Sequence, residues 1–262
     1  MNTGFVGTAY LCRVLSDYGH NEATYKLFLN RDYPGWLYEL EKGATTIWER
    51  WDSIREDGQL ADPGMNSLNH YANGAVVEWL YRNAAGLQPL EDAPGFQVLH
   101  YAPQPNARLE WLSAEYRSAC GTYKSRWRIT PEQLHFTLTI PFGGQARLVL
   151  PDAPDTIILN GKLTDYASGM TLTTGIYEIS YAPTQVYCQV ITLNSPVRDV
   201  LASPAAQSVL LRHIPAFIHI NPVLLDTASG TVHELLTKVG IVLSDEVAQS
   251  LLTEWRVVQP WD

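Results

Sequence analysis

Hydrophobic residues in the first hundred positions recur at the three- and four-residue steps of an amphipathic helix. The pattern predicts helices over residues 4–18, 22–29 and 66–86, with Asn21 as the cap of the second. The last of these is the most regular, and its apolar stripe comprises Leu68, Ala72, Ala75, Val76, Trp79 and Leu80. Residues 33–65 are less regular, and long ordered segments inside a compact domain are usually functional.

Near Pro94 the period changes to strict alternation, which is typical of half-buried antiparallel strands. The clearest strand covers residues 134–140, and similar short runs fall at 109–116, 123–129, 145–150, 156–159, 177–181 and 186–191. Turn residues separate these runs, so we predict an antiparallel β-sandwich over residues 94–193. Trp111 and Trp127 fall in two of the runs and are expected in its core.

After Asn194 the pattern is helical again. Ser203 followed by Pro204 predicts a helix with a serine N-cap and proline at its first position. Further short helices are expected over residues 231–239 and 244–255. The prediction is therefore a multidomain α and β chain: helices over 1–93, the sandwich over 94–193 and a small helical extension over 194–262.

Composition narrows the possible functions. The 262 residues carry a net charge of −9, and the 18 Lys and Arg residues are scattered, so we expect no nucleic-acid partner and no anionic membrane surface. From the residues at its start we expect no signal peptide, and no apolar run approaches the roughly 20 residues that span a bilayer. Three distant cysteines, Cys12, Cys120 and Cys188, are typical of free thiols in a reducing compartment. These features predict a soluble, cytoplasmic protein.

One aromatic segment carries the candidate chemistry. Glu49 lies between Trp48 and Trp51, and aromatic walls bind the apolar faces of sugar rings. A glycosidase needs two carboxyl groups flanking the bond that it cleaves. A purely structural role fits the same residues, with tryptophans in the core and His70 as a hydrogen-bonded helix residue. No phosphate-binding loop and no metal-spaced cluster of His and Cys competes with this segment.

The sequence blocks around Glu49 resemble those of a known family. YPGWLYELEKGATTIWERWD and the later MNSLNHYANGAVVEWLYRNAAGL closely resemble bacterial α-L-rhamnosidases of glycoside hydrolase family seventy-eight. The opening TGFVGTAYLCRVLSDYGHNEATYKLFL looks like the helices that precede this motif. The resemblance covers most of residues 3–87 and is specific, because GATTxWE followed by NHY is not a generic pattern. The region after APQP is similar to the family's C-terminal β-sandwich.

The resemblance implies a fold, a mechanism and site residues. Residues 1–93 would be the last helices of an (α/α)6 toroid, the six-hairpin glycosidase fold, and the mechanism would be inverting. Glu49, the glutamate of the TTxWE motif, is implied as the general base that activates water. His70 of the NHY motif is implied in the rhamnose subsite, with Trp48 and Trp51 as its neighbours. An inverting mechanism needs no cofactor, and we predict neither a cofactor nor a metal site.

One part of the family's pattern is missing. The general acid of the family lies upstream in a segment resembling DxPxRxE, which this chain does not contain, and Asp52 is too near Glu49 to reach the far side of the scissile bond. We therefore expect a truncated α-L-rhamnosidase fragment that is inactive alone. Apolar helix faces, such as the stripe from Leu68 to Trp79, would be left bare and favour self-association or capture of an upstream catalytic fragment.

Two other hypotheses stay open. The chain could act as a hydrolase on a rhamnosyl glycoside when a partner chain or a homo-oligomer completes the site. Alternatively, it could be a non-enzymatic carbohydrate-binding or interaction protein that uses the sandwich. Sugar binding that survives replacement of Glu49 and His70 would favour this last hypothesis.

Overall fold

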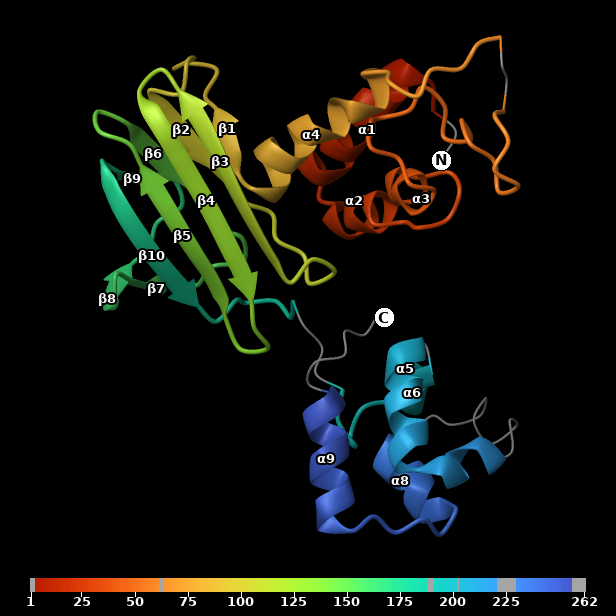
Figure 1. Cartoon of the computed structure of the whole chain (residues 1–262). Helices are drawn as coiled ribbons and strands as arrows, with labels where there is room; N and C mark the ends of the chain where they lie inside the picture. Colours follow the sequence, from red (N-terminus) through yellow and green to blue (C-terminus); the bar gives the residue numbers. More distant parts are fainter. Residues whose placement is uncertain (1–2, 62–63, 188–190, 202, 221–229, 256–262) are drawn as a thin grey trace. The chain divides into compact units, whose positions relative to one another are not determined.

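The computed structural model describes residues 3–61, 64–187, 191–201, 203–220 and 230–255 (Figure 1). It divides into two compact units, Met1–Gln185 and Val186–Asp262. Along the chain, helices come first, two β-sheets follow, and further helices end the described part. This order confirms the multidomain α and β class predicted from the sequence. No helix in the described part is both long and apolar enough to cross a membrane.

The first unit begins with short helices that share a small core. They are α1 (Phe5–Asp17), α2 (Asn21–Phe28), α3 (Trp36–Glu41), the 3₁₀ helix η1 (Ala72–Ala75), α4 (Val76–Trp79) and the π-helix η2 (Leu80–Ala84). Their buried cluster consists of Cys12, Tyr25, Trp36, Val76, Trp79 and Ala84. Burial raises the pKa of the Cys12 thiol to about 12, so this thiol stays protonated and packs as a small apolar group.

Helix α1 turns its small residues inward and its large apolar residues outward. Thr8, Cys12 and Ser16 are buried. The large apolar residues are exposed: Val6 (76%), Tyr10 (57%), Val14 (48%) and Tyr18 (79%). These four residues recur every fourth position and therefore form one continuous stripe, which we call the outer face of α1. The pattern predicted the helix, but the described chain does not cover its apolar face.

The helix predicted over residues 66–86 begins later, at Ala72. Glu49 N–H donates to Ser67 O at 2.9 Å, and Ser67 N–H donates to the Glu49 carboxylate at 2.9 Å. His70 N–H donates to Ile47 O at 2.8 Å. Backbone groups that are bound to the Ile47–Glu49 segment are not available for a helical turn, so the helix starts after them.

The apolar stripe is covered from Ala72 to Trp79, so the prediction that it would be left bare is wrong for this part, whereas Leu68 is 39% exposed. Ala72, Val76 and Trp79 are buried, and the Trp79 indole donates to Ser16 Oγ at 2.8 Å. The outer face of α1 is an apolar surface that the described part of this unit leaves bare.

Two local predictions about the first helices also differ from the structure. Asn21 is the first residue of α2 and not its cap: its side-chain oxygen accepts a hydrogen bond from the Ser16 hydroxyl, and its amide donates to the backbone oxygens of Gln104 and Pro105, each at 3.3 Å. The segment 33–65, predicted to be irregular, contains the short helix α3.

Two sheets make up the sandwich of the first unit. One has the order β1-β2-β6-β9 and the other β3-β4-β5-β10-β7-β8. The strands are β1 (Leu87–Pro89), β2 (Val98–Tyr101), β3 (Trp111–Ser118), β4 (Gly121–Ile129), β5 (Leu134–Ile140), β6 (Gln145–Leu148), β7 (Thr156–Leu159), β8 (Lys162–Asp165), β9 (Met170–Leu172) and β10 (Gly175–Tyr181). Within these sheets β2 and β6 are parallel, and the other pairs are antiparallel.

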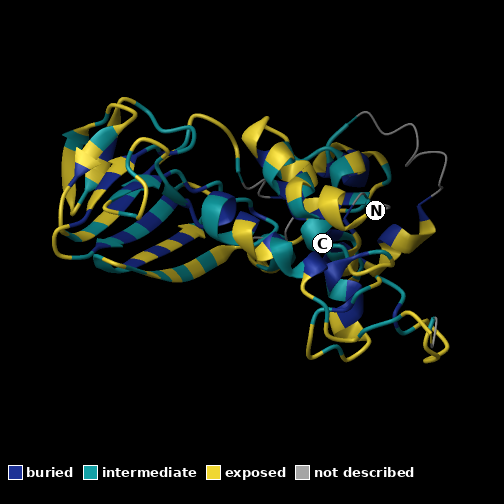
Figure 2. Cartoon of the chain, turned by 90° about the horizontal axis from the view of Figure 1, so that it is seen from above, coloured by how far each residue is buried: buried dark blue, intermediate teal, exposed yellow. Residues whose placement is uncertain are grey.

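Burial alternates along the strands, as Figure 2 shows by its banded colours. In β5 the predicted alternation is confirmed, with Leu134, Phe136, Leu138 and Ile140 buried. Trp127 of β4 is buried as predicted, but Trp111 is 55% exposed, because it is paired with the exposed Arg128 and lies on the outer face of the sheet. The strand predicted over 186–191 is not formed at residues 186, 187 and 191, and residues 188–190, with Cys188, lie outside the described part.

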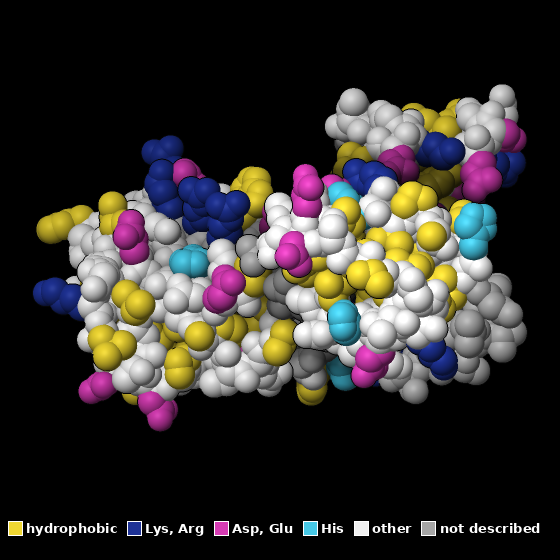
Figure 3. All heavy atoms as spheres, turned by 90° about the horizontal axis from the view of Figure 1, so that it is seen from below, with side chains coloured by type: hydrophobic (Ala, Val, Ile, Leu, Met, Phe, Trp, Pro, Cys, Tyr) yellow, Lys and Arg dark blue, Asp and Glu magenta, His cyan; other side chains and the backbone are white. Residues whose placement is uncertain are grey.

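The cations are less scattered than the sequence suggests. Lys124, Arg126 and Arg128 alternate along β4 and are all exposed, so they form one file on the outer side of the sheet. Figure 3 shows Lys and Arg side chains gathered over the sandwich, on the left of the view. Lys124 is paired with Glu115 on the neighbouring strand at 2.7 Å.

Buried hydrogen bonds join the sandwich to the helices of the same unit. The Trp127 indole donates to Ala84 O at 2.7 Å, and Ser125 Oγ donates to Ala85 O at 2.6 Å. Gly86 follows with a φ of 75°, and a Cβ atom there would lie 2.2 Å from the backbone nitrogen of Pro103. Only glycine fits this close approach of two chain segments. The junction therefore holds the last helix and the sandwich in a fixed geometry.

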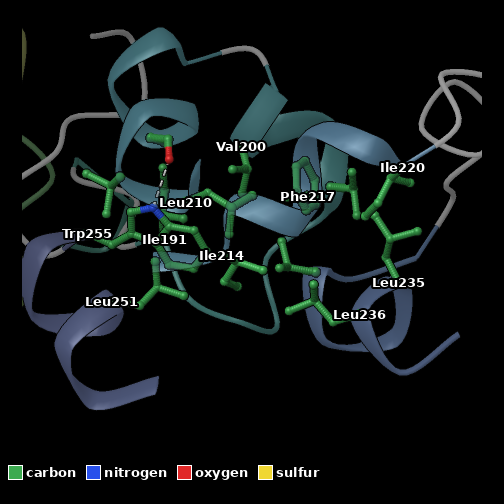
Figure 4. Close-up of a cluster of buried hydrophobic side chains, with 14 residues drawn as sticks. Ile191, Val200, Leu210, Ile214, Phe217, Ile220, Leu235, Leu236, Leu251 and Trp255 are labelled. Atoms are coloured by element: carbon green, nitrogen blue, oxygen red, sulfur yellow. Dashed lines mark hydrogen bonds between the residues drawn. The ribbon is translucent and has the colours of Figure 1, made fainter. Parts of the chain in front are cut away.

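The second unit is a small helical core (Figure 4). Its elements are α5 (Val197–Leu201), α6 (Pro204–His213), η3 (Pro215–His219), α8 (Val232–Lys238) and α9 (Asp245–Trp255). Val200, Leu210, Leu251 and Trp255 are fully buried in one cluster, and the Trp255 indole donates to Ala206 O at 3.1 Å. The two predicted C-terminal helices are confirmed, and Thr231 and Glu234 form a capping box on the first.

Ser203 caps α6 as predicted, so Ser203→Ala should destabilise the second unit by about 1 kcal/mol. Its hydroxyl accepts the Ala206 N–H bond at 3.0 Å, and the change leaves this buried donor without a partner. Hydrogen exchange of the α6 amides measures the effect. Protection unchanged from the wild type would show that the cap contributes nothing.

Candidate functional site

The candidate base, Glu49, is held by a two-way pairing with Ser67. One carboxylate oxygen, Oε2, accepts the Ser67 N–H bond at 2.9 Å, and the Glu49 N–H donates to Ser67 O at the same distance. The other oxygen, Oε1, makes no hydrogen bond with any residue in the described part of the chain. The carboxylate is therefore fixed in orientation and keeps one oxygen free to accept a proton from water.

Glu49 lies on the wall of a cavity of about 400 Å³. The cavity is lined by Thr3, Gly4, Phe5, Tyr33, Glu49, Arg50, Trp51, Asp52, Met65 and Asn73. Its size and mixed lining are typical of a small-molecule site. Asp52 is the second carboxylate of this lining, and its Oδ1 accepts a bond from Arg50 Nε at 3.1 Å.

The two tryptophans beside Glu49 have different positions. Trp51 lines the cavity and packs edge-on against Trp36, with ring centroids 5.1 Å apart and an interplanar angle of 86°. Trp48 is 2% exposed and belongs to the core. The structure therefore brings Trp51, but not Trp48, to the same cavity as Glu49.

His70 lies next to the cavity without lining it. Its ring stacks on Phe5, a lining residue, with centroids 4.9 Å apart. Nδ1 accepts the Ala72 N–H bond at 3.2 Å, so in the neutral ring the proton lies on Nε2. The backbone thus orients His70, and the ring reaches the cavity only through its contact with Phe5.

A buried carboxyl group that the sequence did not indicate supports the Glu49 segment. Glu39 of α3 is 2% exposed, and its Oε2 accepts the Trp48 N–H bond at 3.2 Å. The Asn73 amide donates to Trp48 O at 3.4 Å, so the backbone N–H and the backbone oxygen of Trp48 are both bound by side chains. The second Glu39 oxygen, Oε1, is buried without a partner in the described part. Burial raises the pKa of Glu39 to about 7, against the opposing effect of the Trp48 hydrogen bond.

The described residues contain no group of three or more His, Cys, Asp or Glu side chains that could hold a metal ion. The polar groups of the cavity are instead suited to hydrogen bonding and proton transfer. Phe5, Tyr33 and Met65, which sequence reasoning did not single out, add apolar surface to the wall.

Comparison with known protein families gives two consecutive matches. Residues 1–84 match the family model described as the bacterial alpha-L-rhamnosidase 6 hairpin glycosidase domain. Residues 86–163 match the model of the bacterial alpha-L-rhamnosidase C-terminal domain. The boundary between the matches coincides with the buried junction at Ala84, Ala85 and Gly86.

Individual relatives agree with these matches. The chain is 39% identical over 158 residues to an α-L-rhamnosidase of Streptomyces avermitilis, which covers 60% of this chain and 15% of the relative. It is 40% identical over 151 residues to an α-L-rhamnosidase of Formosa agariphila, covering 58% of this chain and 16% of the relative. The chain thus spans less than a fifth of the length of these two curated relatives.

Two solved structures of α-L-rhamnosidases also match the chain. The crystal structure of the Streptomyces avermitilis α-L-rhamnosidase complexed with L-rhamnose matches with a TM-score of 0.62 and 34% identity, over 69% of this chain and 18% of that one. The structure of the Aspergillus terreus enzyme matches with a TM-score of 0.60 and 30% identity, over 71% of this chain and 20% of that one.

Proposed function

We propose that Glu49 is the general base of an inverting α-L-rhamnosidase site. The chain belongs to the bacterial α-L-rhamnosidase family, because it matches the glycosidase domain and the C-terminal domain of that family in succession. The substrate would be a rhamnosyl glycoside. Trp51, His70 and, through the segment that it holds, Trp48 would shape the sugar subsite. We further propose the division into residues 1–93, the end of the toroid, 94–193, the sandwich, and 194–262, a helical extension.

The free oxygen of Glu49 carries this proposal. Oε2 accepts the Ser67 N–H bond, while Oε1 has no hydrogen-bond partner among the described residues, and the Glu49 side chain lines the cavity. A general base must be oriented and must keep a lone pair for the water proton. The cavity wall is apolar enough, through Phe5, Trp51 and Met65, to pack against the non-polar face of a sugar ring.

No described residue of the cavity is placed to act as the general acid, the second carboxyl group that the inverting mechanism needs. An inverting enzyme needs an acid roughly 6.5–9.5 Å from the base, on the other side of the bond. Asp52 is three residues from Glu49 and is engaged by Arg50, and Glu39 is buried behind Trp48. The 262-residue chain alone would therefore bind and orient water without protonating a leaving group. This argues for a fragment that is inactive alone.

The exposed outer face of α1 supports the proposal that another polypeptide segment completes the site. Six hairpins comprise twelve helices, and the described residues 3–84 hold only α1, α2, α3 and the composite helix from Ala72 to Ala84. Val6, Tyr10, Val14 and Tyr18 are exposed in a stripe that further helices of such a domain could cover. Either an upstream catalytic fragment or a second copy would bury this face.

An assay of the purified chain tests the proposal. With an aryl α-L-rhamnoside we expect no turnover above that of the Glu49→Gln variant, because the general acid is lacking. Turnover that Glu49→Gln abolishes would contradict the inactive fragment and show that the chain or its oligomer contains both carboxyl groups. Release of the aryl group is followed by absorbance, and size-exclusion chromatography of the same sample gives the oligomeric state.

A further inference from the structure

A second cavity, of about 550 Å³, opens where the last helices meet the sandwich of the first unit. It is lined by Val77, Glu78, Tyr81, Arg82, Leu87, Pro89, Phe96, Glu115, Tyr116 and Arg117. None of these residues lines the cavity of Glu49. The buried junction described above fixes the helix and the strands on either side, so the two walls of this cavity belong to one rigid framework.

Three aromatic rings form one side of the cavity. Phe96 packs on Tyr116 with ring centroids 4.2 Å apart, and Tyr81 meets Tyr116 edge-on at 6.3 Å. The Tyr81 and Tyr116 hydroxyl groups make no hydrogen bond with any other residue of the described chain. Rings with electron-rich faces attract the polarised C–H groups of a sugar, and free phenol hydroxyls can bond to its hydroxyls.

Phe96 has a backbone conformation that non-glycine residues rarely adopt. Its φ is 62°, which for a bulky residue costs on the order of 1 kcal/mol or more. The Tyr123 hydroxyl donates to Phe96 O at 2.9 Å and helps to hold this conformation. Strain of this kind clusters at ligand sites, and here its effect is to place the Phe96 ring against Tyr116.

The lining carries charges of both signs. Its carboxylates are Glu78 and Glu115, its guanidinium groups are Arg82 and Arg117, and Glu115 is already paired with Lys124 at 2.7 Å. Arg117 has no ion-pair partner in the described part, whereas Glu78 lies 3.5 Å from Arg82. Guanidinium donors next to carboxylate acceptors suit a ligand whose groups both donate and accept, which is the property of sugar hydroxyls.

From these features we infer that the cavity between η2 and β3 is a second carbohydrate site, separate from Glu49, that binds a neutral 6-deoxyhexose such as L-rhamnose without cleaving it. Tyr116 and Phe96 would stack on the ring, and Arg117 would bond to its hydroxyls. Val77, Leu87 and Pro89 would receive the methyl group that a 6-deoxy sugar carries in place of a hydroxymethyl group. The choice of sugar rests on the proposed function, but the site itself does not need Glu49.

Titration of the full chain with L-rhamnose, followed by NMR, tests this site. We expect saturable binding that Tyr116→Ala weakens at least 10-fold. Trp111→Ala is the matched control, because Trp111 is an exposed aromatic residue of the same strand outside the cavity, and it should leave the affinity unchanged within 2-fold. L-mannose, which differs from L-rhamnose only by a hydroxyl at C6, should bind at least 10-fold more weakly, because the apolar wall cannot bond to that hydroxyl.

Glu49→Gln separates this proposal from the proposed function. Binding that survives Glu49→Gln and is lost in Tyr116→Ala supports the second site, whatever the hydrolysis assay gives. Binding lost in Glu49→Gln and kept in Tyr116→Ala would place the sugar in the first cavity and overturn it, as would no binding of L-rhamnose by the wild-type chain. The Arg117→Ala and Tyr116→Phe variants provide a second test. The Arg117 side chain is exposed, and its loss removes no contact within the described chain. If both variants bind L-rhamnose with unchanged affinity, the proposed contacts to the sugar hydroxyls are overturned.

Discussion

Replacing Glu49 with Gln is expected to lower kcat/KM for an aryl α-L-rhamnoside by about 10²- to 10⁴-fold in a completed site. The amide has the shape of the carboxylate and can still accept the Ser67 N–H bond at 2.9 Å. It cannot take a proton from the attacking water, so only the chemical step is affected. The measurement uses a chimera in which residues 1–163 of this chain replace the matching segment of the Streptomyces avermitilis relative, which supplies the rest of the enzyme.

Glu41→Gln is the matched control for this experiment. Glu41 is on α3, makes an exposed ion pair with Arg31 at 2.6 Å and does not line the cavity. The same chemical change there should leave kcat/KM within 2-fold of the unmutated chimera. Full activity of the Glu49→Gln chimera, or an equal loss in both variants, would contradict the assignment of Glu49 as the base.

The sequence predicts the elements better than it predicts what covers them. Alternation along 134–140 gives both the strand β5 and its buried side, because one face of the sandwich is always turned to the core. Periodicity along α1 gives the helix, but its apolar stripe is exposed and Thr8, Cys12 and Ser16 are buried. A periodic pattern reports that an apolar face exists; it does not say whether the partner of that face is in the same chain.

The helix from Ala72 shows the other limit of periodicity. Residues 66–71 fit the helical pattern, yet hydrogen bonds to residues 46–49, distant in sequence, hold them in an irregular loop. Trp111 shows the same limit in the sandwich, since its pairing with the exposed Arg128 puts it on the outer face, which alternation within its own segment does not reveal. Pairing between distant segments decides both cases.

The candidate site was predicted in part. The motif identified Glu49 and Trp51, which line the cavity together, and its blocks also contain Tyr33 and Met65, whose place on the wall was not predicted. Phe5 comes from α1, and nothing in its local sequence connects it to Glu49. Glu39 was missed for a related reason: in the run Glu39-Leu40-Glu41 on α3, it is the charged residue that is buried and Leu40 that is exposed. Hydrophobicity predicts the opposite arrangement.

Glu39 should make the stability of the first unit depend on pH. Its pKa is about 7 in the folded chain and 4.5 when exposed, so below pH 4.5 it is protonated in both states. Between pH 4.5 and 7 only the unfolded chain releases the proton, so the free energy of unfolding falls as pH rises. This difference in pKa corresponds to a loss of about 3 kcal/mol in the free energy of unfolding. Glu39→Gln should remove the loss, because the Gln side chain stays neutral at every pH. The variant should therefore gain about 3 kcal/mol relative to the wild type between pH 4 and pH 8, measured by urea unfolding with tryptophan fluorescence.

The adjacent Glu41→Gln variant separates this effect from other titrating groups. Glu41 is on the same helix, but its carboxylate is exposed and paired with Arg31, so its replacement should not change the slope of stability with pH. If Glu39→Gln and the wild type lose stability in parallel from pH 4 to pH 8, Glu39 is ionised in the folded chain despite its burial. The Trp48 N–H bond and the partnerless Oε1 would then have to sustain a buried charge, which the geometry around Glu39 does not provide.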